Sequence, residues 1–131
     1  MAQIIPCQLD IFTGEPTKVS SKVAREADII YNTTSIGQTS TEEEGKSPMS
    51  RAMVQLLKPD AAIDDAVYMP IETPLLSIAR TRGGLLLVDG TEMLLHQAVE
   101  QVRIFTGKDD VPVAIMREAL RAEVLRRQAA A

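Results

Sequence analysis

Short apolar runs alternate with longer segments of helical periodicity along this sequence, and that alternation constrains the fold more than any other feature. The runs with strand character are Asp28 to Asn32, Ala61 to Tyr68 and Leu85 to Val88. Helical patterns or capping signals mark residues 18–27, 49–57, 73–82, 89–105 and 112–128. Strands separated by such helices form right-handed βαβ units in a parallel sheet. The sequence therefore predicts an α/β fold with a short, mostly parallel sheet flanked by helices.

Local signals refine this picture at several element ends. Thr73 and Pro74 predict a helix start, because Thr accepts a hydrogen bond at the N-cap and Pro lacks only an N–H that the first turn leaves unused. Asp89-Gly90-Thr91-Glu92 has the spacing of a capping box. The unbroken apolar run Leu85 to Val88 is typical of a strand covered on both faces. Gln3 to Leu9 is a further strand candidate, whose proline favours the edge of a sheet.

Length, charge and cysteine content exclude several classes of protein. The chain has 131 residues, a net charge of −4 and one cysteine. This length suits a single domain over residues 1–131. The acidic balance argues against nucleic-acid binding, because a phosphate surface requires a basic face. No apolar run approaches the ~20 residues of a membrane span, and the first residues do not resemble a signal peptide. Lone Cys7 indicates a reducing, cytoplasmic location, and His96 lacks partners at metal-ligand spacing.

Three polar segments follow the predicted strands, and they are the best candidates for a binding site. They are Asn32 to Gly37, Tyr68 to Thr73 and Asp89 to Met93. Ligands of open parallel sheets bind outside the carboxyl ends of the strands, where these segments would meet. On the last helix of this group, Met93 and Gln97 share a face. Polar strand ends are also ordinary turn chemistry, so spacing alone leaves both interpretations open.

The same segments resemble those of shikimate dehydrogenases. Asn32-Thr33-Thr34-Ser35-Ile36-Gly37 resembles the family's N-T/A-T-x-x-G element. Residues 65–76, DAVYMPIETPLL, are similar to its D-x-x-Y-x-P-x-x-T-x-L-L signature. Residues 89–107, with the D-G-T-E-M-L start and the Q-A-V-E-Q and F-T-G segments, resemble its final stretch, closest to the form fused to dehydroquinate dehydratase. The three blocks occur in family order over about residues 27–120, and together they indicate the C-terminal part of such an enzyme.

This resemblance implies a partial Rossmann-like three-layer fold, resembling the distal half of an NADP-binding domain, and a reaction. The reaction is the NADP-dependent interconversion of 3-dehydroshikimate and shikimate. Matched position by position, the resemblance assigns Thr34 and Ser35 to the nucleotide, and Ala66, Gly90 and Met93 to the border of the nicotinamide. It assigns Tyr68 and Gln97 to substrate oxygens.

Two parts that the resemblance requires are absent from the sequence. No G-x-G-x-x-[GA] motif occurs, so the turn that binds the dinucleotide pyrophosphate is lacking. The family's substrate domain, with its catalytic Lys and Asp pair, also has no counterpart, and no catalytic residue is assigned. We therefore expect a truncated relative that is not competent alone, and doubtful NADP binding by this chain.

The missing central strand would leave Asp28 to Asn32 with an unpaired edge. We expect self-association as a dimer, or a second chain that supplies the missing half. Two alternatives to a truncated relative remain at this point. The chain is one half of a two-chain dehydrogenase, or it is a non-enzymatic oligomeric module for ligand binding or interaction.

Overall fold

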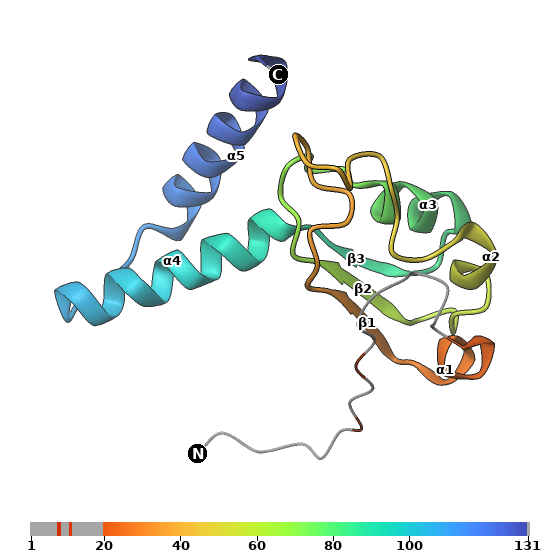
Figure 1. The fold of residues 1–131 in the computed structure, drawn as a ribbon. Helices are drawn as coiled ribbons and strands as arrows, with labels where there is room; N and C mark the ends of the chain where they lie inside the picture. The colour runs from red at the N-terminus through yellow and green to blue at the C-terminus, as the bar shows by residue number, and fades with distance from the viewer. Residues whose placement is uncertain (1–7, 9–10, 12–19, 131) are drawn as a thin grey trace.

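The computed structural model of this chain describes residues 8, 11 and 20–130, and it confirms the predicted α/β fold. Its elements alternate as the sequence indicates (Figure 1). In chain order they are α1 (Ser21–Glu26), β1 (Ile29–Asn32), α2 (Arg51–Val54), β2 (Ala62–Asp65), α3 (Pro74–Arg82), β3 (Leu86–Val88), α4 (Gly90–Thr106) and α5 (Val113–Ala130). The strand candidate Gln3 to Leu9 lies outside the described residues, apart from Gln8.

The three strands form a parallel sheet in the order β1-β2-β3. One face of this sheet carries Ile30, Ile63 and Leu87, which pack with the main hydrophobic core. The other side of that core comes from the helices α1, α2 and α3, through Ala24, Val54 and the buried face of α3. This packing places the carboxyl ends of all three strands at one rim of the sheet.

The helix boundaries follow the local signals in the sequence. The side chain of Thr73 accepts a hydrogen bond from the N–H of Leu76 at 3.2 Å, and Pro74 opens α3. The backbone of Gly107 has a φ of 66°, and this left-handed residue ends α4. These caps confirm the predicted starts and stops.

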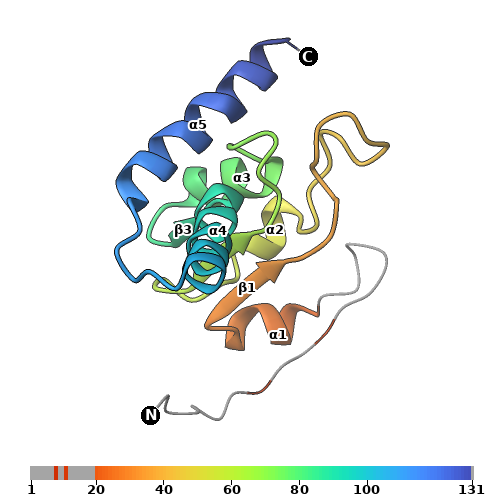
Figure 2. The same ribbon diagram turned by 90° about the vertical axis from the view of Figure 1, so that its left-hand side faces the viewer.

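Helices α4 and α5 form a hairpin that extends away from the sheet (Figures 1 and 2). Leu95, Val99 and Val111 are the buried centre of a second hydrophobic cluster inside this hairpin. Side chains of α5, including Met116 and Leu120, pack against them. The hairpin therefore has a small core of its own, separate from the core under the sheet.

The second face of the sheet is open in the described part of the chain. Ile29 is 67% exposed and Leu86 is 64% exposed, although both are apolar. The expectation that Leu85 to Val88 is covered on both faces is therefore wrong for Leu86. An apolar run indicates that a strand can be buried on both sides. Whether both sides are covered depends on residues outside that run. Among residues 20–130, the outer edge of β1 has no strand beside it. None of the described helices is both long enough and apolar enough to cross a membrane.

Candidate functional site

A buried hydrogen-bond network ties the ends of β1 and β2 to the start of α3. The Asp65 side chain is fully buried, and its Oδ1 accepts from Asn32 Nδ2 at 2.9 Å and from the Val67 N–H at 3.1 Å. Its Oδ2 accepts from the Thr73 hydroxyl at 2.7 Å. Thr73 in turn caps α3, so one carboxylate connects two strands and a helix.

Burial raises the pKa of Asp65 from its ordinary value, and the hydrogen bonds from Thr73, Val67 and Asn32 oppose that change. These three donors satisfy the carboxylate inside the protein. A buried carboxylate with full hydrogen bonding is expensive to remove, because its donors would then remain unpaired. The role of Asp65 is therefore to hold the rim of the sheet in one shape.

The loop after β1 is shaped by Asn32. Its Oδ1 accepts hydrogen bonds from the Thr34 N–H at 3.1 Å and from the Thr34 hydroxyl at 2.7 Å. The Thr34 hydroxyl also accepts from the Ile36 N–H at 3.2 Å. Thr34, which the family resemblance assigns to the nucleotide, thus has its hydroxyl engaged in the loop, while the neighbouring Ser35 is exposed.

Four of the seven predicted site residues line one cavity of about 350 Å³ at this rim, namely Thr34, Ser35, Ala66 and Tyr68. The remaining lining residues are Thr33, Gln38, Thr39, Ser40, Val67 and Met69. Hydroxyl and amide groups dominate the polar part of this lining, and it contains no Asp, Glu, Lys, Arg or His. The cavity can hold a neutral, hydroxyl-bearing group, but it offers no carboxylate, amine or imidazole for proton transfer.

Gly90, which the resemblance assigns to the border of the nicotinamide together with Ala66, lies against the backbone that follows β2. It is buried, and a Cβ at this position would lie 2.5 Å from the carbonyl oxygen of Ala66 and 2.6 Å from that of Val67. The glycine therefore permits α4 to start directly against the backbone after β2. This close approach gives a packing reason for glycine at this position, and the assignment of Gly90 to the nicotinamide stays a prediction.

Met93 and Gln97 lie on α4, outside the lining of this cavity. The Met93 sulfur accepts a hydrogen bond from the Tyr31 hydroxyl at 2.7 Å, which joins the first turn of α4 to β1. Gln97 is exposed one turn further along the helix. Their assignments to the nicotinamide and to substrate oxygens therefore stay predictions. In the structure both residues lie on α4 near the rim, outside the cavity.

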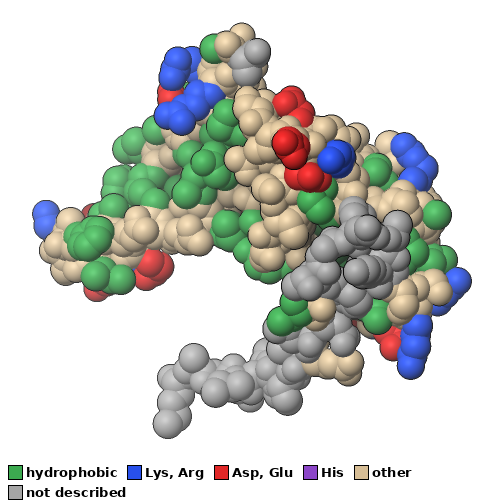
Figure 3. Space-filling view, in the orientation of Figure 1, with side chains coloured by type: hydrophobic (Ala, Val, Ile, Leu, Met, Phe, Trp, Pro, Cys, Tyr) green, Lys and Arg blue, Asp and Glu red, His purple; other side chains and the backbone are tan. Residues whose placement is uncertain are grey.

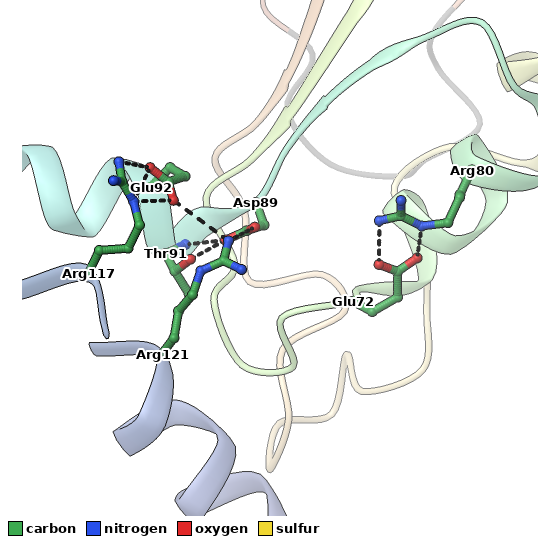
Figure 4. Close-up of polar contacts among 7 residues, drawn as sticks. All are labelled: Glu72, Arg80, Asp89, Thr91, Glu92, Arg117 and Arg121. Carbon is green, nitrogen blue, oxygen red and sulfur yellow. Dashed lines mark hydrogen bonds and ion pairs between the residues drawn. The ribbon is translucent and has the colours of Figure 1, made fainter. Parts of the chain in front are cut away.

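The start of α4 is held to α5 by ion pairs (Figure 4). Arg117 donates to both oxygens of Glu92, with Nε–Oε1 at 3.0 Å and Nη2–Oε2 at 2.9 Å. Arg121 donates to Asp89 Oδ2 at 2.9 Å, while the other oxygen of Asp89 accepts from Thr91 and caps the helix. The predicted capping box is thus half right: Asp89 caps α4, but the Glu92 carboxylate turns to α5. Hydrogen bonds from Arg117 lower the pKa of Glu92.

The cavity fits one part of a dinucleotide and not the rest. Its hydroxyl groups and the backbone of Ala66 and Val67 suit a ribose and a flat, uncharged ring. Phosphate groups require a glycine turn at a helix N-terminus or a cation, and the cavity lining has neither. The residues present therefore fit the ribose and the reduced, uncharged nicotinamide of NADPH, and they do not fit its phosphates.

Asn32 and Asp65 are the important rim residues that the sequence analysis did not assign. Both are part of the motifs quoted for the family, but a motif does not separate a residue that touches ligand from one that supports the rim. Their signal in the sequence is a polar residue at the last position of a short strand. A buried polar side chain at that position needs internal partners, which predicts a network.

Comparison with known proteins is consistent with this geometry. The model of the shikimate 5'-dehydrogenase C-terminal domain matches residues 90–121. The shikimate dehydrogenase (NADP(+)) of Synechococcus sp. (strain JA-2-3B'a(2-13)) is 38% identical over 94 residues, which are 70% of this chain and 32% of that relative. The chain thus spans about a third of the length of the curated relatives it matches.

Two solved structures share the fold. Quinate dehydrogenase from Corynebacterium glutamicum in complex with NAD superposes with a TM-score of 0.67 at 34% identity, covering 82% of this chain and 35% of that one. Shikimate 5-dehydrogenase from Thermus thermophilus, in complex with NADP(H) and shikimate, gives 0.66 at 31% identity, covering 79% and 37%. The neighbours are Rossmann-like enzymes, and the likeness covers about four fifths of this chain.

Proposed function

We infer that the chain belongs to the shikimate dehydrogenase family as a counterpart of the C-terminal part of these enzymes. We also infer that this chain alone binds a ligand of the family but does not catalyse the family reaction. The supporting observation is the hydroxyl-lined cavity at the strand ends, whose lining has no carboxylate, amine or imidazole. The family reaction moves a hydride between NADP and shikimate or 3-dehydroshikimate. This cavity offers a rim for the nicotinamide end of the cofactor, and its lining has no carboxylate, amine or imidazole for the accompanying proton.

Ligand recognition in this proposal depends on the exposed polar groups of the cavity. Ser35 and the phenol of Tyr68, which is 40% exposed, are free to meet a ligand, whereas Thr34 is held by Asn32. The family's substrate contacts, including Gln97, remain assignments by likeness. Quinate is as good a substrate class as shikimate in this proposal, because the structural neighbours include a quinate dehydrogenase.

Ligand binding and turnover can be measured separately on the purified chain. Titration with reduced nicotinamide riboside and with NADPH, followed by ligand-observed NMR, should give similar affinities, because no cation in the cavity rewards the phosphates. Ser35→Ala and Tyr68→Phe should each weaken binding about fivefold, the value of one hydrogen bond. Ser21→Ala, on the exposed first turn of α1, is the control. NADP-dependent oxidation of shikimate should stay at background.

Two results would contradict this proposal. One is substantial NADP-dependent shikimate oxidation by a sample whose intact mass shows this chain alone. The other is equal ligand affinity in the wild type and in the Ser35 and Tyr68 variants, which would place the ligand elsewhere. Absence of binding by any tested ligand would favour a non-enzymatic interaction module.

A two-chain enzyme is the second candidate, and the open edge of β1 favours it. In that case another chain supplies the glycine-rich strand and the Lys and Asp pair, and association of this chain is part of its function. We propose a cytoplasmic location for either candidate, from the lone cysteine. Mixing this chain with a protein that carries those elements should restore oxidation of shikimate, while a chain with the outer edge of β1 blocked by Ile29→Pro should not.

A further inference from the structure

The open face of the sheet is an apolar surface with one carboxylate at its centre. Strand pairing places its side chains in two rows, Ile29 beside Ala62 and Leu86, and Tyr31 beside Asp64 and Val88. Parallel sheets are stable when helices cover both faces. Among residues 20–130, α1 to α3 cover one face, and the first turn of α4 reaches the other only at its edge, through Met93 and Tyr31. This face therefore requires a covering layer that brings apolar side chains.

Asp64 gives this surface a negative charge, so the covering layer must also bring a positive one. Its Oδ1 is buried and has no hydrogen-bond partner among the described residues. Burial raises the pKa of Asp64, and the neighbouring carboxylates of Asp65 and Asp89 raise it further. A carboxylate in such a place is stabilised by a cation that arrives with the covering layer.

The outer face of α5 has the matching features. Ile115 is 68% exposed, and exposed alanines continue its face at positions 119, 122 and 129. Leu125, which is 57% exposed, and the exposed Glu118 lie along one side of this face. Arg126 follows Ile115 by eleven residues, which is close to three helical turns, so it lies on this face too. Figure 3 shows hydrophobic side chains gathered over α4 and α5, with basic side chains at the far end of α5.

Arg126 can leave its present partner without isolating it. Its Nε and Nη2 donate to Glu123 at 2.8 Å each, but Arg127 also donates to Glu123 at 2.7 Å. These hydrogen bonds from Arg126 and Arg127 lower the pKa of Glu123 to about 2. When Arg126 turns away, Glu123 keeps one guanidinium, which makes Arg126 available to a carboxylate on another molecule.

We propose that α5 of a second copy of this chain covers the open sheet face, with Arg126 of that copy paired to Asp64. The hairpin that carries α5 projects from the sheet (Figures 1 and 2), so two copies can exchange their hairpins symmetrically. The α5 of each copy then packs on the open sheet face of the other copy. This inference deepens the self-association expected of the family-like chain, because it names the two surfaces that meet.

Single substitutions on each surface test the pairing by sedimentation velocity over a wide concentration range. The wild type should form a dimer. Leu86→Glu on the sheet face and Ile115→Glu on α5 should each be monomeric, because a charge would face an apolar surface. Phe105→Glu is the matched control, since Phe105 is 82% exposed at the end of α4, outside both surfaces. It should dimerise like the wild type.

Mixing the two monomeric variants gives the decisive result. The Ile115→Glu chain keeps an intact sheet face, and the Leu86→Glu chain keeps an intact α5, so the mixture should form heterodimers through that one pair. Circular dichroism and thermal unfolding of each variant establish that it is folded. A variant that fails to fold is replaced by the milder Leu86→Ser or Ile115→Ser and tested in the same mixture.

The charge pair is tested by Asp64→Asn and Arg126→Gln. Each should raise the dimer Kd about tenfold or more, and the double variant should lose no more than either single one. A larger loss in the double variant would remove Arg126 from the proposal.

Several results would overturn the docking of α5. They are a monomeric wild type at every concentration, an Ile115→Glu variant that dimerises normally, or a mixture without heterodimers. Dimerisation that survives Ile115→Glu but not Leu86→Glu would indicate pairing between two sheets instead. Ligand titrations of the same variants keep the two proposals apart, because none of these substitutions touches the cavity of Ser35 and Tyr68.

Discussion

At the scale of single residues, the rim depends on two positions where the sequence has little freedom. Asp65 accepts three internal hydrogen bonds, and Gly90 allows two backbone segments to touch. Both lie in motifs that are easily interpreted as ligand contacts. Their contacts in the fold show that both shape the rim, beside exposed residues such as Ser35.

Asp65→Ala should lower the free energy of unfolding by about 3 kcal/mol or more, because it leaves buried donors of Asn32, Val67 and Thr73 unpaired. Urea unfolding monitored by circular dichroism measures the change. Asp65→Asn, which keeps part of the network, should fall between this variant and the wild type. Asp60→Ala, at an exposed site, should be close to neutral, and an equal effect at both positions would refute the role assigned to Asp65.

Gly90→Ala should cost about 1–3 kcal/mol of stability, the usual range for a methyl group forced into a packed site. The new Cβ would meet backbone atoms, which cannot rotate away. Gly45→Ala separates steric clash from backbone strain, because Gly45 has a φ of 74° and open space around it. Equal ligand affinity per folded molecule in Gly90→Ala and wild type would show that the glycine serves packing.

At the scale of elements, α4 is the joint between the sheet and the helical hairpin. Its first turn touches the backbone after β2 at Gly90, β1 through Met93, and α5 through Glu92 and Asp89. The rest of α4 packs mainly against α5 within the described structure. The orientation of the hairpin is therefore set by a few contacts in one helical turn.

The ion pair between Glu92 and Arg117 predicts a pH-dependent stability of this joint. The pKa of Glu92 is lower in the folded chain than its ordinary value of 4.5, so its stabilising effect is present above that value and is lost as the pH falls through the folded pKa. Glu92→Gln should therefore lower the urea midpoint modestly at neutral pH and leave it unchanged in strong acid. Glu118→Gln, on the exposed side of α5, should have little effect at either pH.

Element positions were largely predictable from sequence, whereas the covering of elements was not. Thr73 and Gly107 act through local backbone geometry, so their effect on α3 and α4 can be deduced from neighbouring residues. The exposure of Leu86 depends on a layer that other residues must supply. The partner of Glu92 lies twenty-five positions away on α5, and no local pattern distinguishes it from a capping contact.

At the scale of the whole molecule, residues 20–130 form a sheet covered on one face and a projecting hairpin, each with its own hydrophobic core. The cavity belongs to the sheet and its loops, and α5 belongs to the hairpin. Four of the predicted ligand residues meet at the cavity because parallel strands end on one side. Gly90, Met93 and Gln97 follow β3 into the hairpin, so they lie at or beyond its junction with the sheet.

Hydrogen exchange on dilute protein should reveal the two cores as separate units. Amides of β2, which has a strand on each side, should exchange only through global unfolding. Amides of α5 should exchange through a smaller opening, because its contacts in one chain are confined mainly to α4. Uniform protection across β2 and α5 would show that the hairpin and the sheet unfold together.

The open sheet face also has a consequence for how much of this protein a cell can maintain. A fold that gains part of its stability from a bound copy or partner follows mass action, so its resistance to unfolding rises with the supply of that partner. Copies made in excess of the partner would present Ile29 and Leu86 to chaperones and proteases for longer. Synthesis rate and turnover would then be coupled, and the amount of folded protein would respond to expression more steeply than in proportion.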